Sequence, residues 1–235
     1  MKINVITVTY NQLEGLKKQY KSILSQSKYV KEWIVYDDRS KDGTIDWIGK
    51  QTPCFPVKII EGIKREKPLV VANMNECMKE TDGGVFILSF ADSYYKEDAL
   101  KNLSETYIPN SFGSAARIDV NEKGQPLQGY FLNNVDKSED DVRNMMSTKR
   151  GWESFAGNGM IATKSIMEGI GYIDETYGGY GVDDYDTAMR TMMNGALLYL
   201  YLNVKIYHTS HFVKNTTPDN IKRYMTKLEG TGYSL

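Results

Sequence analysis

The chain of 235 residues lacks the features that mark several common protein classes. Its two cysteines, Cys54 and Cys77, have no metal-ligand spacing, which excludes a disulfide framework and favours a reducing compartment. The first residues read as a strand, too short to span a bilayer, and lack the small-residue cleavage site of a signal peptide. We therefore expect a cytoplasmic protein without an integral membrane segment.

An excess of charge of either sign is also absent. The chain has 29 Lys and Arg against 30 Asp and Glu, a formal net charge of −1. This balance gives no overall drive toward nucleic acid or an anionic membrane, and the one basic stretch, in residues 17–31, reads as the solvated face of a helix. The length and a hydrophobic content of 41% suit a single sizeable domain with a packed core.

The first hundred residues alternate between short apolar runs and helical patterns. The apolar runs predict strands over 3–8, 33–36, 57–60 and 85–88. Helical patterns lie between them: Asn11 is the expected cap of the first, and the third starts near Pro68 and ends near Lys79. This order predicts an α/β fold with a mostly parallel sheet flanked by helices.

Polar side chains follow three of these predicted strands. Thr9, Tyr10 and Asn11 come after the first strand, Asp37 and Asp38 after the second, and Ala91-Asp92-Ser93 after the fourth. Ligands of open α/β sheets bind beyond the carboxyl ends of the strands. The sequence therefore predicts a site for a cation and a nucleotide at this edge.

The pattern changes in the second half of the chain. Residues 115–120 and 128–131 flank turn residues and predict a hairpin, while 133–150 are charged and weakly periodic, as in a mobile loop or a plain exposed connector. Further strands are predicted at 160–162 and 197–207, and a surface helix in the tail from Thr216.

Three carboxylates lie beside a glycine-rich turn in residues 178–187. Asp183, Asp184 and Asp186 come just before a run with helical period. Glycine permits the turn, and the start of the following helix favours negative charge. Such a cluster is typical of a cleft floor, and its plain alternative is an acidic helix cap on a solvated surface.

These blocks together resemble family 2 glycosyltransferases of the GT-A fold over nearly the whole length. Arg39 stands where the family usually has glycine, and Phe90 stands at the first aspartate of its metal motif. The later blocks resemble an acceptor half that includes galactosyltransferase-like branches. The blocks that carry the resemblance are 5–11, 35–44, 86–93, 157–162, 169–175 and 178–186 with Arg190.

The resemblance implies an inverting transfer of a sugar from a nucleotide-diphosphate sugar, most simply a UDP-sugar, to an acceptor hydroxyl. Asp184 falls on the position of the general base, with Asp183 beside it in the acceptor site. Asp92 is the remaining aspartate of the metal motif, and His208 matches the late histidine that completes the metal sphere in several branches, with His211 as second candidate. Oxygen and imidazole ligands favour Mn²⁺ over Mg²⁺ as the divalent cofactor.

The remaining assignments concern the two substrates. Tyr10 is expected to stack on the nucleobase and Asp37 to accept a hydrogen bond from its N–H group. Trp152, Gly157 and Asn158 are expected to bind the acceptor, and a packed core tryptophan is the alternative for Trp152. The acceptor stays open among a glycan, a lipid-linked sugar, a protein side chain and a modified nucleic-acid base.

We expect a single GT-A domain over 1–235, with a nucleotide-binding half in 1–95, an acceptor-binding half in 96–215 and a tail in 216–235. The oligomeric state is open. Two other functions are kept: a nucleotidyltransferase, whose Gly-rich, Arg-containing loop is missing after the first strand, and a non-catalytic module that binds a sugar nucleotide or glycan. Phe90 keeps the second one open.

Overall fold

We describe a computed structural model of the chain, covering residues 1–64, 69–127, 144, 150–209 and 217–231. Strands and helices alternate through the first half, as the sequence predicts, because short apolar runs are separated by amphipathic segments. The elements in chain order are β1 (Ile3–Thr9), α1 (Leu13–Leu24), η1 (Ser27–Tyr29), β2 (Val30–Asp37), α2 (Thr44–Ile48), β3 (Val57–Glu61), α3 (Val70–Lys79), β4 (Val85–Phe90), β5 (Ser93–Tyr95), α4 (Ala99–Thr106), β6 (Ser111–Val120), η2 (Gly151–Ser154), β7 (Met160–Thr163), α6 (Lys164–Gly169), α7 (Asp183–Met193), β8 (Leu197–Thr209) and α8 (Pro218–Glu229).

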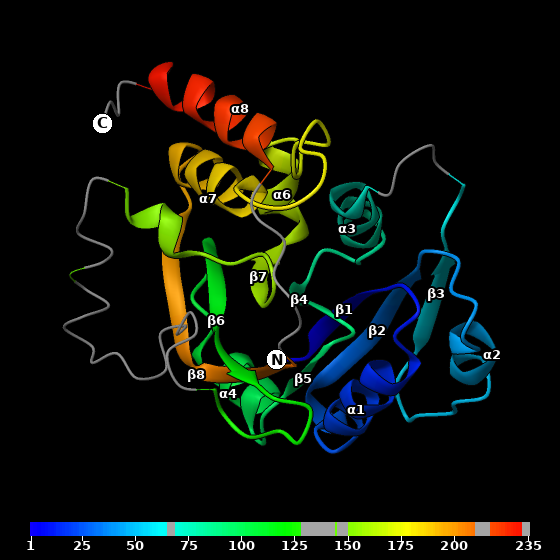
Figure 1. The fold of residues 1–235 in the computed structure, drawn as a ribbon. Coiled ribbons are helices and arrows are strands. Elements are labelled where there is room, and N and C mark those ends of the chain that lie inside the picture. The colour runs from blue at the N-terminus through cyan, green and yellow to red at the C-terminus, as the bar shows by residue number, and fades with distance from the viewer. Residues whose placement is uncertain (65–68, 128–143, 145–149, 210–216, 232–235) are drawn as a thin grey trace.

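The described strands form one eight-stranded sheet in the order β3-β2-β1-β4-β7-β6-β8-β5 (Figure 1). The strands β3, β2, β1 and β4 run parallel to one another, and β6 runs parallel to β8. The pairs β4–β7, β6–β7 and β5–β8 are antiparallel. The α/β fold with a mixed, mostly parallel sheet is therefore confirmed.

Helices cover both faces of the sheet (Figure 1). The alternation of β1 shows how the sequence builds the two layers, because Ile3 and Val5 face α1 and α4 whereas Ile6 and Val8 face α3, α6, α7 and α8. All four side chains are at most 7% exposed. The two apolar layers hold the strand ends in fixed positions.

The start of α1 differs from the expectation. The helix begins at Leu13, and Asn11 is not its cap. Asn11 lies two residues earlier with φ of 50°, and its Oδ1 accepts a hydrogen bond from the backbone N–H of Lys41. The carboxylate of Asp42 accepts the bond from the Leu13 N–H instead. The side chain that caps the start of this helix therefore comes from the loop after β2.

The second half also departs from a simple hairpin. The strand β6 is longer than predicted and pairs with β7 and β8, with only an isolated bridge from Val120 to Pro126. Its register with β8 shifts, since Ala115 lies opposite Tyr201 and Ala116 opposite Lys205. The predicted second arm at 128–131, Pro68, and the predicted loop at 133–150 except residues 144 and 150 lie outside the described residues.

Two further observations bear on the class of protein. Cys54 and Cys77 are both free thiols. Within the described ranges, no helix combines the length and the apolar character needed to cross a bilayer.

Candidate active site

The ends of β1 and β2 form the first part of the site. The backbone N–H of Asp38 donates to the Thr9 carbonyl at 2.9 Å, and the Gly62 N–H donates to the Asp37 carbonyl at 2.8 Å. Asn11 donates its N–H to the Ser40 hydroxyl at 2.7 Å. These bonds lock the two strand-end turns together, so the side chains that follow β1 and β2 meet as predicted.

Two buried acceptors in these turns have no hydrogen-bond partner among the described residues. They are the Thr9 hydroxyl and Oδ1 of Asp37, whose other oxygen accepts the Ser40 N–H at 2.8 Å. Asp37 is 1% exposed. Leaving a buried polar group unpaired costs about 1–3 kcal/mol, which a donor from a ligand would recover. Asp38 is half-buried beside Asp37, and the neighbouring Tyr10 is 57% exposed.

The second part of the site is built where β4, β5, β6 and β8 meet. The side chain of His208 lies between two carboxylates: its Nδ1 is 2.7 Å from Oδ1 of Asp119, and its Nε2 is 3.5 Å from Oδ2 of Asp92. The pairing places Ser93 and Asp119 opposite His208, and the Thr209 N–H donates to the Asp92 carbonyl at 2.9 Å. Asp92 and His208 thus come together as the sequence predicts.

The electrostatics of this group follow from its two carboxylates. Burial lowers the pKa of His208, but hydrogen bonds to Asp119 and Asp92 outweigh burial and raise it to about 9. Nε of Arg117 lies 3.3 Å from the Oδ1 of Asp119 that faces His208. Arg117 and His208 therefore both lie beside Asp119, and Asp92 lies on the Nε2 side of the ring.

The fit of a divalent cation rests on Asp92 and His208. Two neighbouring ligands ~2.1 Å from an octahedral cation lie ~3.0 Å apart, about 0.5 Å less than the 3.5 Å between Oδ2 and Nε2. The described residues contain no group of three or more potential ligands. Phe90, at the first position of the motif, is half-buried and packs against the core. His211 lies outside the described residues, so its predicted role stays a prediction.

The third part of the site is the N-terminus of α7. Oδ2 of Asp184 accepts the Gly157 N–H at 3.3 Å, and its Oδ1 accepts the Tyr185 N–H at 3.0 Å. Burial, and then the neighbouring charge of Asp183, raise the pKa of Asp184 to about 7. Burial likewise raises the pKa of Asp183. A carboxylate with such a pKa is suited to accept a proton near neutral pH.

A short chain of contacts links this carboxylate to the Asp92 group. Gly157 donates to Asp184, and the adjacent Asn158 donates from Nδ2 to the Ser93 hydroxyl at 2.8 Å. Ser93 in turn donates to Oδ1 of Asp92 at 3.1 Å. Asp92 and Asp184 therefore lie on the same side of the sheet, connected through one loop. Asn158 is 5% exposed, so it connects these groups and offers little surface to an acceptor.

Tyr180 lies within electrostatic reach of both carboxylate groups, and it has no specific role in the sequence-based expectations. Burial raises its pKa; Asp184, Asp183 and Asp119 raise it further, whereas Arg117 lowers it. Its side chain is 50% exposed. An exposed aromatic ring within electrostatic reach of both groups is a candidate platform for a sugar.

The structure corrects the expected role of Trp152. Its side chain is 2% exposed within the core, and its indole N–H donates to the Tyr224 hydroxyl at 2.7 Å. No face of the ring is available for stacking on a sugar. The alternative of a packed core tryptophan is the one that the structure shows.

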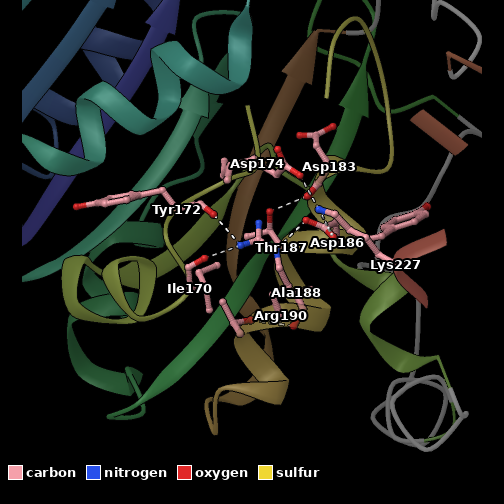
Figure 2. Close-up of polar contacts among 12 residues, drawn as sticks. Ile170, Tyr172, Asp174, Asp183, Asp186, Thr187, Ala188, Arg190 and Lys227 are labelled. Atoms are coloured by element: carbon pink, nitrogen blue, oxygen red, sulfur yellow. Dashed lines mark hydrogen bonds and ion pairs between the residues drawn. The ribbon is translucent and has the colours of Figure 1, made fainter. Parts of the chain in front are cut away.

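Asp186, the third acid of the glycine-rich block, belongs to a buried ionic cluster (Figure 2). Its Oδ2 accepts from Nε of Arg190 at 2.8 Å, and its Oδ1 accepts from Nζ of Lys227 at 3.0 Å. Arg190 also donates to the carbonyls of Ile170 and Tyr172. This cluster joins α7 to α8 and to the loop after α6, so it anchors the helix whose N-terminus carries Asp183 and Asp184.

This fold and this site together define a glycosyltransferase of the GT-A type. Residues 4–163 match the family described as "Glycosyl transferase family 2", and the chain belongs to that family. Membership of this family rules out the nucleotidyltransferase alternative. Asp184 and His208 lie beyond the matched residues, so their roles rest on the geometry above.

Two curated proteins are similar in sequence. One is a dolichyl N-acetyl-alpha-D-glucosaminyl phosphate 3-beta-D-2,3-diacetamido-2,3-dideoxy-beta-D-glucuronosyltransferase of Methanococcus voltae, 27% identical over 229 residues, 90% of this chain and 68% of that protein. The other is a dolichol-phosphate mannosyltransferase of Pyrococcus furiosus, 33% identical over 129 residues, 51% of this chain and 36% of that protein.

Two solved structures share the fold. Staphylococcus aureus TarS 1–349 matches with a TM-score of 0.66 at 17% identity, over 97% of this chain and 64% of that one. GalNAc-T7, solved with UDP, GalNAc and Mn²⁺, matches with a TM-score of 0.71 at 14% identity, over 96% of this chain and 48% of that one. The chain thus spans less than two thirds of either structure.

Proposed function

We propose that the chain transfers a sugar from a UDP-sugar to an acceptor hydroxyl with inversion at the anomeric carbon, using Asp184 as general base and a divalent cation at Asp92 and His208. The observation that carries the proposal is the linkage of Asp184 to Asp92 through Gly157, Asn158 and Ser93. This linkage supports a proton acceptor at Asp184 and a cation-binding pair at Asp92 and His208 that act on the same substrate.

The unpaired acceptors at the ends of β1 and β2 support a nucleotide there. Oδ1 of Asp37 is buried and unpaired among the described residues, and the N–H of a uracil ring would satisfy it. Tyr10 is exposed next to it and offers a ring for stacking. The bound UDP in the GalNAc-T7 structure and in a second TarS structure supports the choice of uracil. We assign residues 1–95 to the donor half.

Asp184 supports the chemical step. Its two oxygens are oriented by the Gly157 and Tyr185 N–H groups, and its raised pKa lets it take the proton of an attacking hydroxyl near neutral pH. Attack from the side opposite the leaving diphosphate gives inversion. Asp92 and His208 would hold a cation that would stabilise the charge of that diphosphate, and Mn²⁺ suits the oxygen and imidazole ligands.

The second half of the chain, 96–215, is assigned to the acceptor, with Asp183, Gly157 and the exposed Tyr180 nearest to the base; residues 216–235 form the tail. The acceptor is a hydroxyl of a glycan, a lipid-linked sugar, a protein side chain or a modified nucleic-acid base. The two curated relatives are named for transfer involving dolichyl phosphates, which supports testing the lipid-linked sugar first among these acceptors.

The test compares Asp184→Asn with the parent and with Asp219→Asn, an exposed first-turn aspartate of α8 that serves as matched control. Hydrolysis or transfer of UDP-sugars with Mn²⁺ should fall ~10²–10⁴-fold in Asp184→Asn, with UDP binding by calorimetry unchanged. The control should retain full turnover. NMR of the anomeric product should show inversion.

Turnover of Asp184→Asn equal to that of the parent would reject the base assignment. A parent that binds UDP with Mn²⁺ but turns over no donor in a full sugar-nucleotide panel would favour the non-catalytic binding module. Thermal stabilisation by each sugar nucleotide selects the donor for these assays, because a ligand of the folded state raises the melting temperature.

A further inference from the structure

We propose that Asp119 is the positioning residue that makes His208 a metal ligand, which rests on the cation site proposed above. A neutral imidazole carries one proton, and its other nitrogen offers the lone pair for a metal. Asp119 accepts a hydrogen bond on the Nδ1 side at 2.7 Å. The proton of the neutral ring is thereby held at Nδ1, and the lone pair of Nε2 is directed at Asp92.

The sheet holds this arrangement in place. Asp119 lies directly opposite His208 in the parallel pair of β6 and β8, where neighbouring side chains on one face are in contact. The side chain of Asp119 is 3% exposed and that of His208 is 15% exposed. Both side chains are largely buried, and the register of the two strands places the ring beside the carboxylate.

A salt bridge that only stabilises the fold would explain less of the geometry around Asp119 than a positioning role does. A carboxylate as buried as Asp119 is costly unless it is paired, and Arg117 already provides a cation 3.3 Å from the same oxygen. The contact of this oxygen with the histidine therefore does more than neutralise it. The opposite ring nitrogen faces the carboxylate of Asp92, and a cation between two such groups with a carboxylate behind the imidazole is a recurring arrangement in metal sites.

The chain is well suited to a direct test because it contains two histidines, His208 and His211. A His211→Gln variant leaves a single imidazole, so ring ¹⁵N signals report on His208 alone. In the metal-free protein, at a pH where the ring is neutral, we expect the proton on Nδ1. In Asp119→Leu, which has no acceptor, we expect the protonation preference to shift toward Nε2.

The second readout is the affinity for Mn²⁺, measured by the EPR signal of free Mn²⁺ in the presence of UDP. We expect Asp119→Leu to bind Mn²⁺ ~10–100-fold more weakly, the usual effect of removing a carboxylate behind a ligating histidine. Asp119→Asn, which keeps an oxygen acceptor, should lose less. UDP binding without metal should be unchanged in both, and Asp219→Asn should match the parent.

The outcomes separate this proposal from the proposed function. If the parent shows no Mn²⁺ binding that depends on Asp92 and His208, the cation site and the role of Asp119 both fail. If Asp92→Asn loses Mn²⁺ but Asp119→Leu binds it as the parent does, only the role of Asp119 is overturned. If Asp119→Leu does not fold, Asp119→Ala, which also lacks an acceptor, takes its place, and parental affinity together with an unchanged ring tautomer overturns the proposal.

Discussion

We predict a measurable loss of stability when the ionic cluster of Asp186, Arg190 and Lys227 is broken. Asp186 is fully buried and receives one bond from Arg190 on its own helix and one from Lys227 on α8 (Figure 2). Asp186→Asn keeps the shape of the side chain but removes its charge. The half-buried guanidinium of Arg190 then has no carboxylate at this position. Removing one partner of a buried pair costs about 3–5 kcal/mol, a large part of the 5–15 kcal/mol typical of a domain.

Lys227→Met removes the cation instead. Its ammonium donates to Asp186 and, at 2.7 Å, to Asp174, whose side chain is 24% exposed and regains water. With charge-assisted bonds at about 1.5–3 kcal/mol each and the exposed one counting little, we expect a loss of about 2–4 kcal/mol. The matched control is Lys222→Met on the same helix, an exposed lysine without an ion pair among the described residues.

The assay is urea unfolding of the three variants and of the double variant Asp186→Asn/Lys227→Met. With a slope near 3 kcal/mol per molar urea, a loss of 3 kcal/mol lowers the midpoint by about 1 M. The two substitutions share a bond, so their effects should fall short of additive by about 1–3 kcal/mol. A loss below 1 kcal/mol in Asp186→Asn, or an equal loss in Lys222→Met, would refute the reasoning.

The ion pair between Lys227 and Asp174 should make the stability of the fold depend on pH. Burial raises the pKa of Asp174, but bonds from Lys227 and Thr176 outweigh burial and hold it below its ordinary value. A carboxylate with a depressed pKa stabilises the fold above the pKa of the unfolded chain, near 4, and this stabilisation is lost as the pH falls further. Lys227→Met should therefore show a flatter decline of stability below pH 4 than the parent.

Three further outcomes are expected. Trp152→Phe, which loses the bond to Tyr224, should cost about 1–2 kcal/mol in urea unfolding and leave acceptor KM unchanged; a raised KM with intact stability would contradict its place in the core. Gly159→Ala should cost about 1–3 kcal/mol by thermal unfolding, since φ is 93° and a Cβ would lie 2.9 Å from Ile206; an unchanged melting temperature would oppose this. The kcat/KM profile should fall as the pH drops below about 7, because the base Asp184 becomes protonated, and a flat profile from pH 5 to 8 would exclude it.

The sequence predicted much of the fold of the first half of the chain because its signals are local. Alternating apolar residues define β1 and β2, and the polar residues that end them, including Thr9 and Asp37, follow directly. The packing of parallel strands then brings those ends to one edge. Asp92 and His208 were also predicted as a pair, through the resemblance to a family rather than through any periodicity.

The missed features depend on distant contacts. Asp119 reads as an ordinary residue of a predicted hairpin, and its importance appears only when β6 lies beside β8 and places it 2.7 Å from a ring 89 residues later. Trp152 and Asp186 have the residue types of binding groups, yet the elements that bury them, α8 above all, are far away in the chain. A carboxylate at the position opposite a candidate histidine on a neighbouring strand would have been the useful signal.

The register shift between β6 and β8 has a consequence for evolution and engineering. Three residues, 202–204, lie between the partner of Ala115 and the partner of Ala116. If these residues paired one by one with β6, the ladder would continue unbroken from Tyr201 and bring Lys205 opposite Asp119, an ammonium in place of an imidazole. Excision of the three residues would keep His208 opposite Asp119, whereas substitutions that remove the shift at full length would bring a positive charge to the proposed cation site while every strand remained.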